Sequence, residues 1–248
     1  MHEWHWEPDD FAALWLSDAR DRFPRPLHYT SRFRYREEFE THCRSVRSRY
    51  VCEMEAIDLA LNTLETAELR VEVSAETRSS RSGKHTHHRI VGVRNYRHAV
   101  IASQVVVDGT DGSISVRSGH PENLGKRIVG RIPSCGAGRH RAEQFYIRDL
   151  ISTPDTYFVN VARNTPRERY QRFVDRPMTG LGSALLRTGS VHDRTDSAIL
   201  IEWLDFADDG RYILRKNAER IDIRPGGRAD LSVVLAQWIK LAEEGSAH

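Results

Sequence analysis

Three histidines that lie close together are the residues of this sequence best suited to metal chemistry. His85, His87 and His88 fall within four positions, and imidazole is a common ligand of zinc and nickel. In an extended segment, His85 and His87 would project from the same face. No cysteine or carboxylate flanks them within the segment, and zinc requires three or four well-placed ligands. We therefore expect no structural or catalytic metal site here.

Motifs of enzymes are absent from the rest of the sequence. It contains no G-x-S-x-G, P-loop, H-E-x-x-H or G-x-G-x-x-G pattern. Two acidic clusters could in principle act as paired carboxylates or a calcium loop: Asp108 with Asp111, and Asp205 with Asp208 and Asp209. Both clusters fall at expected hairpin turns, where Asp side chains bond their own backbone. We expect neither enzymatic activity nor a cofactor.

Length, charge and cysteine content describe a folded protein without covalent cross-links. The 248 residues include 37 basic and 35 acidic side chains, so the overall field is too weak to recruit nucleic acid or an anionic membrane. Cys43, Cys52 and Cys135 show no C-x-x-C spacing, which argues against a disulfide framework and a thiolate zinc site. The N-terminus lacks the pattern of a signal peptide, and no segment reaches the roughly 18 consecutive apolar residues of a membrane helix. We expect a cytoplasmic protein.

Hydrophobic periodicity predicts both helices and strands in the first half of the chain. Asp9 and Asp10 precede an apolar series that predicts a helix ending before Phe23, and a helical period without internal Gly or Pro runs from Tyr35 to about Leu64. Strands are expected at residues 69–73, 90–93, 99–107 and 113–117, and a helix at 122–132.

The pattern of the second half predicts the same plan: strands at 157–161, 182–187, 197–206, 212–214 and 221–223, and helices at 166–174 and 231–241. The turns Asp111-Gly112 and Asp209-Gly210 lie 98 positions apart, and the strands beside each turn align at the same offset. Asp-Gly is a common turn signal, so two unrelated hairpins could also match. Each half, however, adds an alternating strand before the hairpin and an amphipathic helix after it. We predict a single α+β domain of two related halves, about 1–135 and 136–248, that share one antiparallel sheet.

These elements resemble the EspG family of type VII secretion chaperones. The likeness lies in residues 6–15, 69–73, 91–94, 111–117, 172–182, 201–205 and 209–212, and it spans nearly the whole chain. The resemblance implies a quasi-two-fold α+β fold with a central antiparallel β-sheet flanked by helical bundles. It also implies a cytosolic protein that binds a PE–PPE-like or WXG100-like pair, at the helical tip of the PPE protein, and keeps it soluble for export. The free protein is a candidate homodimer.

Residues 78–89 are the first candidate contact with such a partner. They join two expected strands, and they are too long and polar for a hairpin turn, so we expect a mobile loop. Five of its side chains could order against acidic or carbonyl groups of a helix bundle: Arg78, Arg81, Lys84, His87 and Arg89. One alternative is a solvated surface loop. The other is a nucleic-acid-binding protein that uses this basic loop, with Tyr96 for base stacking.

Two tryptophans and one aspartate are the second set of candidates for partner binding. Trp203 and Asp205 share a face of the expected strand 197–206, with Phe206 on the other face, so one aromatic should point away from the main core. Trp203 is therefore a candidate anchor, and Trp238 on the last helix is another. For each tryptophan the alternative is packing within the core.

Overall fold

The computed structural model describes residues 1–17, 20–151, 165–188 and 198–245. Within these residues the chain forms a ten-stranded sheet in the order β1-β5-β4-β3-β2-β7-β8-β9-β10-β6, and its neighbouring strands are antiparallel. The strands are β1 (His2–Trp6), β2 (Leu69–Arg78), β3 (His85–Arg94), β4 (Ala99–Val107), β5 (Thr110–Gly119), β6 (Glu143–Tyr146), β7 (Met178–Thr188), β8 (Ala198–Phe206), β9 (Arg211–Lys216) and β10 (Arg220–Pro225). The helices are α1 (Pro8–Trp15), α2 (Arg36–Arg49), the 3₁₀ helix η1 (Val51–Glu53), α3 (Met54–Thr66), α4 (Leu124–Val129), α5 (Ile147–Ile151), α6 (Pro166–Val174) and α7 (Arg228–Gly245).

The sheet has a quasi-two-fold arrangement about its central pair of strands, β2 and β7. Read outwards from this pair, the order is β2-β3-β4-β5-β1 on one side and β7-β8-β9-β10-β6 on the other. The helices follow the same plan, because α1 to α3 precede β2 and α5 and α6 precede β7, while α4 follows β5 and α7 follows β10. The predicted α+β fold with a central antiparallel sheet and a quasi-two-fold repeat is confirmed.

The alignment of the two halves expected from the Asp-Gly turns is wrong by one hairpin. The offset of 98 positions pairs the β4–β5 hairpin, which carries Asp111, with the β8–β9 hairpin, which carries Asp209. In the sheet, β3 is equivalent to β8 and β4 to β9, so the counterpart of β4–β5 is β9–β10. The Asp-Gly dipeptide reports a tight turn and carries no information about the place of that turn in a repeat.

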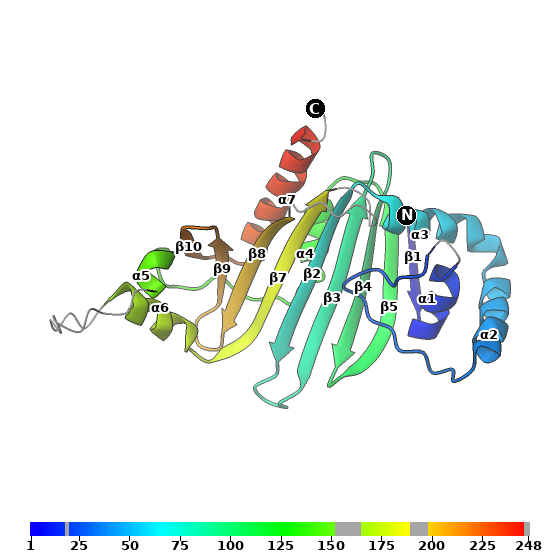
Figure 1. Ribbon diagram of the computed structural model, residues 1–248, viewed down its shortest axis with the longest axis horizontal. Helices are drawn as coiled ribbons and strands as arrows, with labels where there is room; N and C mark the ends of the chain where they lie inside the picture. The colour runs from blue at the N-terminus through cyan, green and yellow to red at the C-terminus, as the bar shows by residue number, and fades with distance from the viewer. Residues whose placement is uncertain (18–19, 152–164, 189–197, 246–248) are drawn as a thin grey trace.

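Helices cover both faces of the sheet, but in different ways. On one face, α4 and α7 pack together over the central strands and form a core cluster with residues such as Val71, Ala184 and Ile201. On the other face, α1, α3 and the end of α2 cover one end of the sheet, with Val91 and Ile114 beneath them. At the other end, α5 and α6 cover β8, β9, β10 and β6. In Figure 1 these two bundles stand at opposite ends of the sheet, with the central strands between them.

The N-terminal helices differ from their predicted lengths. Helix α1 begins with Pro8 in its first turn, as predicted from the acidic pair that follows, but it ends at Trp15. The expected continuous helix from Tyr35 to Leu64 is interrupted at Tyr50, where η1 separates α2 from α3. Tyr50 packs edge-on against Trp6, with ring centroids 6.1 Å apart. A straight helix of that length could not follow the core surface, so the break is imposed by tertiary packing.

Several shorter elements also depart from expectation. Strands β1 and β6, at the two edges of the sheet, and helix α5 were not predicted. Helix α6 has the predicted bounds, and a complete capping box between Thr165 and Glu168 opens it. The strand predicted at 157–161 lies outside the described residues. Edge strands have few cross-strand neighbours, so their pattern in the sequence is weak.

Candidate functional site

The two helical bundles leave the middle of one sheet face uncovered. Strand register places the side chains of β3, β2, β7 and β8 in rows across this gap. Read from β3 to β8, the rows are Val91, Glu72, Leu185, Leu200; then His87, Glu76, Leu181, Leu204; then Arg89, Ser74, Ser183, Glu202. Val91 and Leu204 lie against the bundles, and we call the remaining residues of these rows the open face.

Leucines form the apolar part of the open face. Leu181 and Leu200 are each 46% exposed, although both lie in the middle of the sheet. Leu200 pairs across the strands with Leu185, and Leu181 pairs with Leu204, which packs against the α5–α6 bundle. The Ser183–Glu202 pair separates the two leucine pairs, and the pair formed by Leu181 and Leu204 reaches the base of that bundle. Exposed apolar side chains in the middle of a sheet mark a site of interaction.

Charged groups lie beside the leucines on β2 and β7. Glu72 is opposite Leu185, and its carboxylate lies 3.9 Å from the guanidinium of Arg187. Burial raises the pKa of Glu72 above its usual value, and the nearby Arg187 and Arg70 oppose that shift. A carboxylate that is already partly desolvated gains from a cation or a hydrogen-bond donor supplied by a partner.

The β3 side of the open face is polar and internally paired. The Ser74 hydroxyl and His87 Nε2 are 2.7 Å apart, and the carboxylate of Glu76 lies 3.1 Å from His85 Nε2. Burial lowers the pKa of His87, and Arg89 adds to this effect, so the imidazole is neutral at pH 7. The polar groups on the β3 side of the open face are therefore held in place before any partner binds.

The predicted loop at 78–89 is a hairpin, which corrects the expectation of a long mobile connection. Strands β2 and β3 stay in register from Leu69 opposite Arg94 to Arg78 opposite His85, so only residues 79–84 connect them. Gly83 adopts a φ of 69° in this connection. The alternation of apolar and polar residues that marks a strand is missing here, because polar residues occupy both faces of this part of the hairpin.

The hairpin separates the five predicted contact residues into two groups. Arg78, Arg81 and Lys84 are exposed at its tip, whereas His87 lies on the open face. Arg89 is also on that face, 3.7 Å from the carboxylate of Asp111.

The three histidines do not converge. His85 and His87 share a face of β3, as expected for an extended segment, while His88 points to the opposite face. Across the described ranges of the chain, no group of three or more His, Cys, Asp or Glu residues is arranged to hold a metal ion.

Trp203 and Asp205 lie inside the protein and are not available to a partner in this conformation. Trp203 is 1% exposed and packs in the core beneath α7. Asp205 accepts hydrogen bonds from Nε and Nη2 of Arg211 at 2.6 and 2.7 Å, and both residues are buried. Phe206 lies on the other face of β8, away from the central core as expected, but it is buried in the separate cluster of the α5–α6 bundle and is not exposed. Both sheet faces are covered at the end of β8 that carries these residues, by α7 on one face and by the α5–α6 bundle on the other.

Trp238, on the last helix, is also buried in the core. It is 6% exposed and packs in the cluster between α7 and the sheet. The guanidinium of Arg215 lies 5.8 Å from the centre of its ring. Core packing, the alternative reading of both tryptophans, describes what the structure shows.

The structure also separates the residues expected to bind nucleic acid. Tyr96 is 93% exposed, but it lies in the β3–β4 turn, at the opposite end of β3 from Arg81 and Lys84. The ten residues of β3 separate the two sites by roughly 30 Å. Tyr96 therefore cannot stack a base that the tip of the hairpin contacts.

Comparison with known protein families identifies the family of this chain. The model of the EspG family matches residues 7–237 of the sequence. The chain belongs to the EspG family. Its fold is also similar to that of a solved structure, the Mycobacterium tuberculosis type VII secretion system chaperone EspG5 in complex with a PE25–PPE41 dimer. The match has a TM-score of 0.59 and 12% sequence identity, and it covers 94% of each chain. A comparison with curated proteins gives no match.

Sequence reasoning missed the leucines of the open face in this EspG-family chain. Leu181 and Leu185 alternate with Gly182, Ala184 and Leu186, so β7 is apolar on both faces. That pattern is typical of a strand covered on both sides. It could have signalled a binding surface only if the position of the bundles had been known.

None of the described helices is both long enough and apolar enough to cross a membrane.

Proposed function

We propose that this EspG-family protein is a type VII secretion chaperone that binds a PE–PPE-like pair through its open face. Three findings support the proposal. The family model covers most of the chain, the fold matches that of a chaperone solved with a PE25–PPE41 dimer, and the open face is uncovered apolar surface between two bundles. The last of these carries the proposal, because it is the feature of this chain that can bury the apolar tip of another helical protein.

The leucines supply affinity in this proposal. Complete burial of a leucine is worth about 1.5–3 kcal/mol, so covering the exposed half of Leu181 or Leu200 contributes about 1 kcal/mol each. The two bundles limit the width of what can enter, which favours the end of a helical bundle over a flat surface. Burying that tip is what keeps the client soluble in the cytosol.

Polar groups around the leucines select the client. Two groups of charged side chains contact polar groups around the apolar tip of the client. They are Glu72 and Glu202 on the open face, and Arg78, Arg81 and Lys84 at the end of the β2–β3 hairpin. The EspG-family protein would then form a 1:1:1 complex with the two client chains.

Co-expression with PE–PPE-like pairs tests the proposal. We expect the protein to co-elute with one such pair in size-exclusion chromatography, and the client to precipitate when expressed without it. Leu181→Asp and Leu200→Asp should each weaken the complex at least tenfold, because each puts a charge into the desolvated contact. Leu241→Asp is the matched control, since Leu241 is 59% exposed on α7, which covers the opposite sheet face.

Two results would contradict the proposal. One is a complex that tolerates both open-face substitutions but is lost with Leu241→Asp. The other is recovery of the protein alone, or as a homodimer, with every PE–PPE-like pair tested. If the protein binds only a WXG100-like pair, and the leucine substitutions weaken that complex, the proposed site is correct but the client is a WXG100-like pair.

A further inference from the structure

The middle of the open face carries a carboxylate with leucines on both sides of it. Glu202 lies between Leu200 and Leu204 on β8, and its side chain is exposed. Across the strands it is opposite Ser183 of β7, and one of the two leucine pairs lies on either side of this Ser–Glu pair. Side chains two residues apart on a strand are separated by about 7 Å. A partner surface that covers both leucine pairs must therefore also cover Glu202.

The charge of Glu202 is not compensated within the protein. Among the described residues its side chain forms no hydrogen bond and no ion pair. Burial raises the pKa of the Tyr170 hydroxyl on α6, and the negative charge of Glu202 raises it further. Glu72, on the same face, differs in this respect. Three positive charges act on its carboxylate: Arg187, Arg70 and Arg25.

The arginines on this side of the central strands have partners of their own. The guanidinium of Arg187 lies 3.9 Å from the carboxylate of Glu72, and that of Arg89 lies 3.7 Å from the carboxylate of Asp111. Arg89 is also three strands away from Glu202, which is roughly 14 Å in the sheet. Neither arginine is placed to neutralise Glu202.

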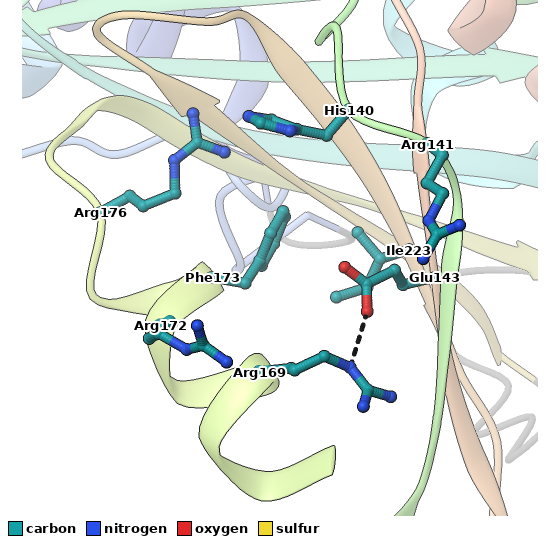
Figure 2. Close-up of a pocket in the computed structure, with 8 residues that line it drawn as sticks. All are labelled: His140, Arg141, Glu143, Arg169, Arg172, Phe173, Arg176 and Ile223. Atoms are coloured by element: carbon teal, nitrogen blue, oxygen red, sulfur yellow. Dashed lines mark hydrogen bonds and ion pairs between the residues drawn. The ribbon is translucent and has the colours of Figure 1, made fainter. Parts of the chain in front are cut away.

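The arginines of the α5–α6 bundle face a different part of the molecule. Three of them line a pocket between α6, the residues that precede β6, and β10, and Figure 2 shows them around it: Arg169, Arg172 and Arg176. Arg169 Nε donates a hydrogen bond to Glu143 in this pocket at 3.3 Å, and Arg176 Nη2 donates to Asp209 at 2.9 Å. Glu202 is not among the residues that line the pocket. A positive charge for Glu202 therefore has to come from a partner.

A client that covers the leucines removes water from this carboxylate. Burial of an unpaired carboxylate costs more free energy than burial of a leucine side chain returns, so a wholly apolar tip fits this surface poorly. A lysine or arginine of the client removes the cost. Its apolar stem packs along the leucines while its charged end reaches Glu202, and the hydroxyl of Ser183 offers a second acceptor beside the carboxylate.

We propose that Glu202 is a specificity-determining residue of the open face, which selects PE–PPE-like clients whose apolar tip carries a lysine or arginine. This inference rests on the proposed function, because it names the group that the client presents to the open face. A tip with an apolar residue at that point leaves the carboxylate buried without a counter-charge, and a tip with an acidic residue adds repulsion.

The affinity of Glu202 variants for the PE–PPE-like pair recovered by co-expression tests the inference in calorimetric titration. Glu202→Gln should bind about tenfold more weakly or worse, and Glu202→Lys about 100-fold more weakly or worse, because each leaves the cation of the client without its counter-charge. The sign of the first change is decisive. Removing a carboxylate that faces no cation would instead tighten the complex.

A charge swap locates the cation. The basic residues of the client tip are replaced by Glu one at a time, and one of these substitutions should restore binding to Glu202→Lys. A restored complex cannot come from damage to the fold. Glu244→Lys is the matched control, since Glu244 is exposed on α7, which covers the opposite sheet face, and its affinity should stay within about twofold of the wild-type value.

The outcomes separate this inference from the proposed function. It is overturned if Glu202→Gln binds as tightly as the wild type or more tightly, or if no substitution in the tip rescues Glu202→Lys, while Leu181→Asp still weakens the complex. That result would leave the open face as the binding site. If no PE–PPE-like pair binds the wild-type protein, the proposed function fails and this inference fails with it.

Discussion

Replacing Asp205 tests whether this residue stabilises the core or contacts a partner. In the structure its carboxylate accepts two short hydrogen bonds from Arg211, at 2.6 and 2.7 Å, and the arginine side chain is 1% exposed. The further contacts of this guanidinium among the described residues are with uncharged groups, the carbonyl oxygen of Pro133 at 3.0 Å and the ring of Trp203, whose centre lies 5.4 Å from the guanidinium carbon. Asp205→Ala would therefore leave a buried cation without a counter-charge.

The expected loss follows from the burial of the pair. Removing one partner of a buried ion pair costs about 3–5 kcal/mol, against a total stability of about 5–15 kcal/mol for a typical domain. For a chain of this size, each 1 kcal/mol shifts the melting temperature by about 2–4 °C, so the variant should melt roughly 6–20 °C lower. Replacing both partners with apolar residues, as in Asp205→Leu/Arg211→Met, should restore much of the stability.

Urea and thermal unfolding, followed by circular dichroism, measure these differences. Glu40→Ala is the control, because Glu40 pairs with Arg36 on the exposed surface of α2, and it should change stability by no more than about 0.5 kcal/mol. If Asp205→Ala costs less than about 1 kcal/mol yet abolishes client binding, the reasoning from burial is refuted and Asp205 is a contact residue.

Two further predictions concern stability. Burial alone raises the pKa of Asp209, but hydrogen bonds from Tyr212 and other donors hold it well below the usual value. A depressed pKa contributes stability above about pH 4 that is lost as the pH falls towards the folded-state pKa. The difference in unfolding free energy between wild type and Asp209→Asn should therefore shrink from pH 5 to pH 2; a constant difference would contradict the assignment. Gly182→Ala should cost about 1–3 kcal/mol in urea unfolding, because the added Cβ would overlap the buried indole of Trp203, and an unchanged midpoint would show that the ring can move.

Local patterns in the sequence were sufficient for most helices and central strands. The local pattern of residues 166–174 predicted α6 with its correct bounds, since the residues that form this helix also contain its signal. The break at Tyr50 and the edge strand β1 were not predictable in this way, because both depend on contacts between segments far apart in the chain. The pairing of β1 with β5, for example, joins Trp4 to Val116.

The sequence by itself determined the fold class, the repeated plan of strands and helices, and membership of the EspG family, because all three follow from the order and period of local patterns. Tertiary structure alone decided which apolar surfaces stay uncovered. Alternation shows that Leu181 and Leu185 share one strand face and that Trp203 lies on a face of its own strand, but it does not show what covers either face. The position of α7 buries Trp203, whereas the α5–α6 bundle on the other face ends before it reaches Leu181 and leaves the leucines open.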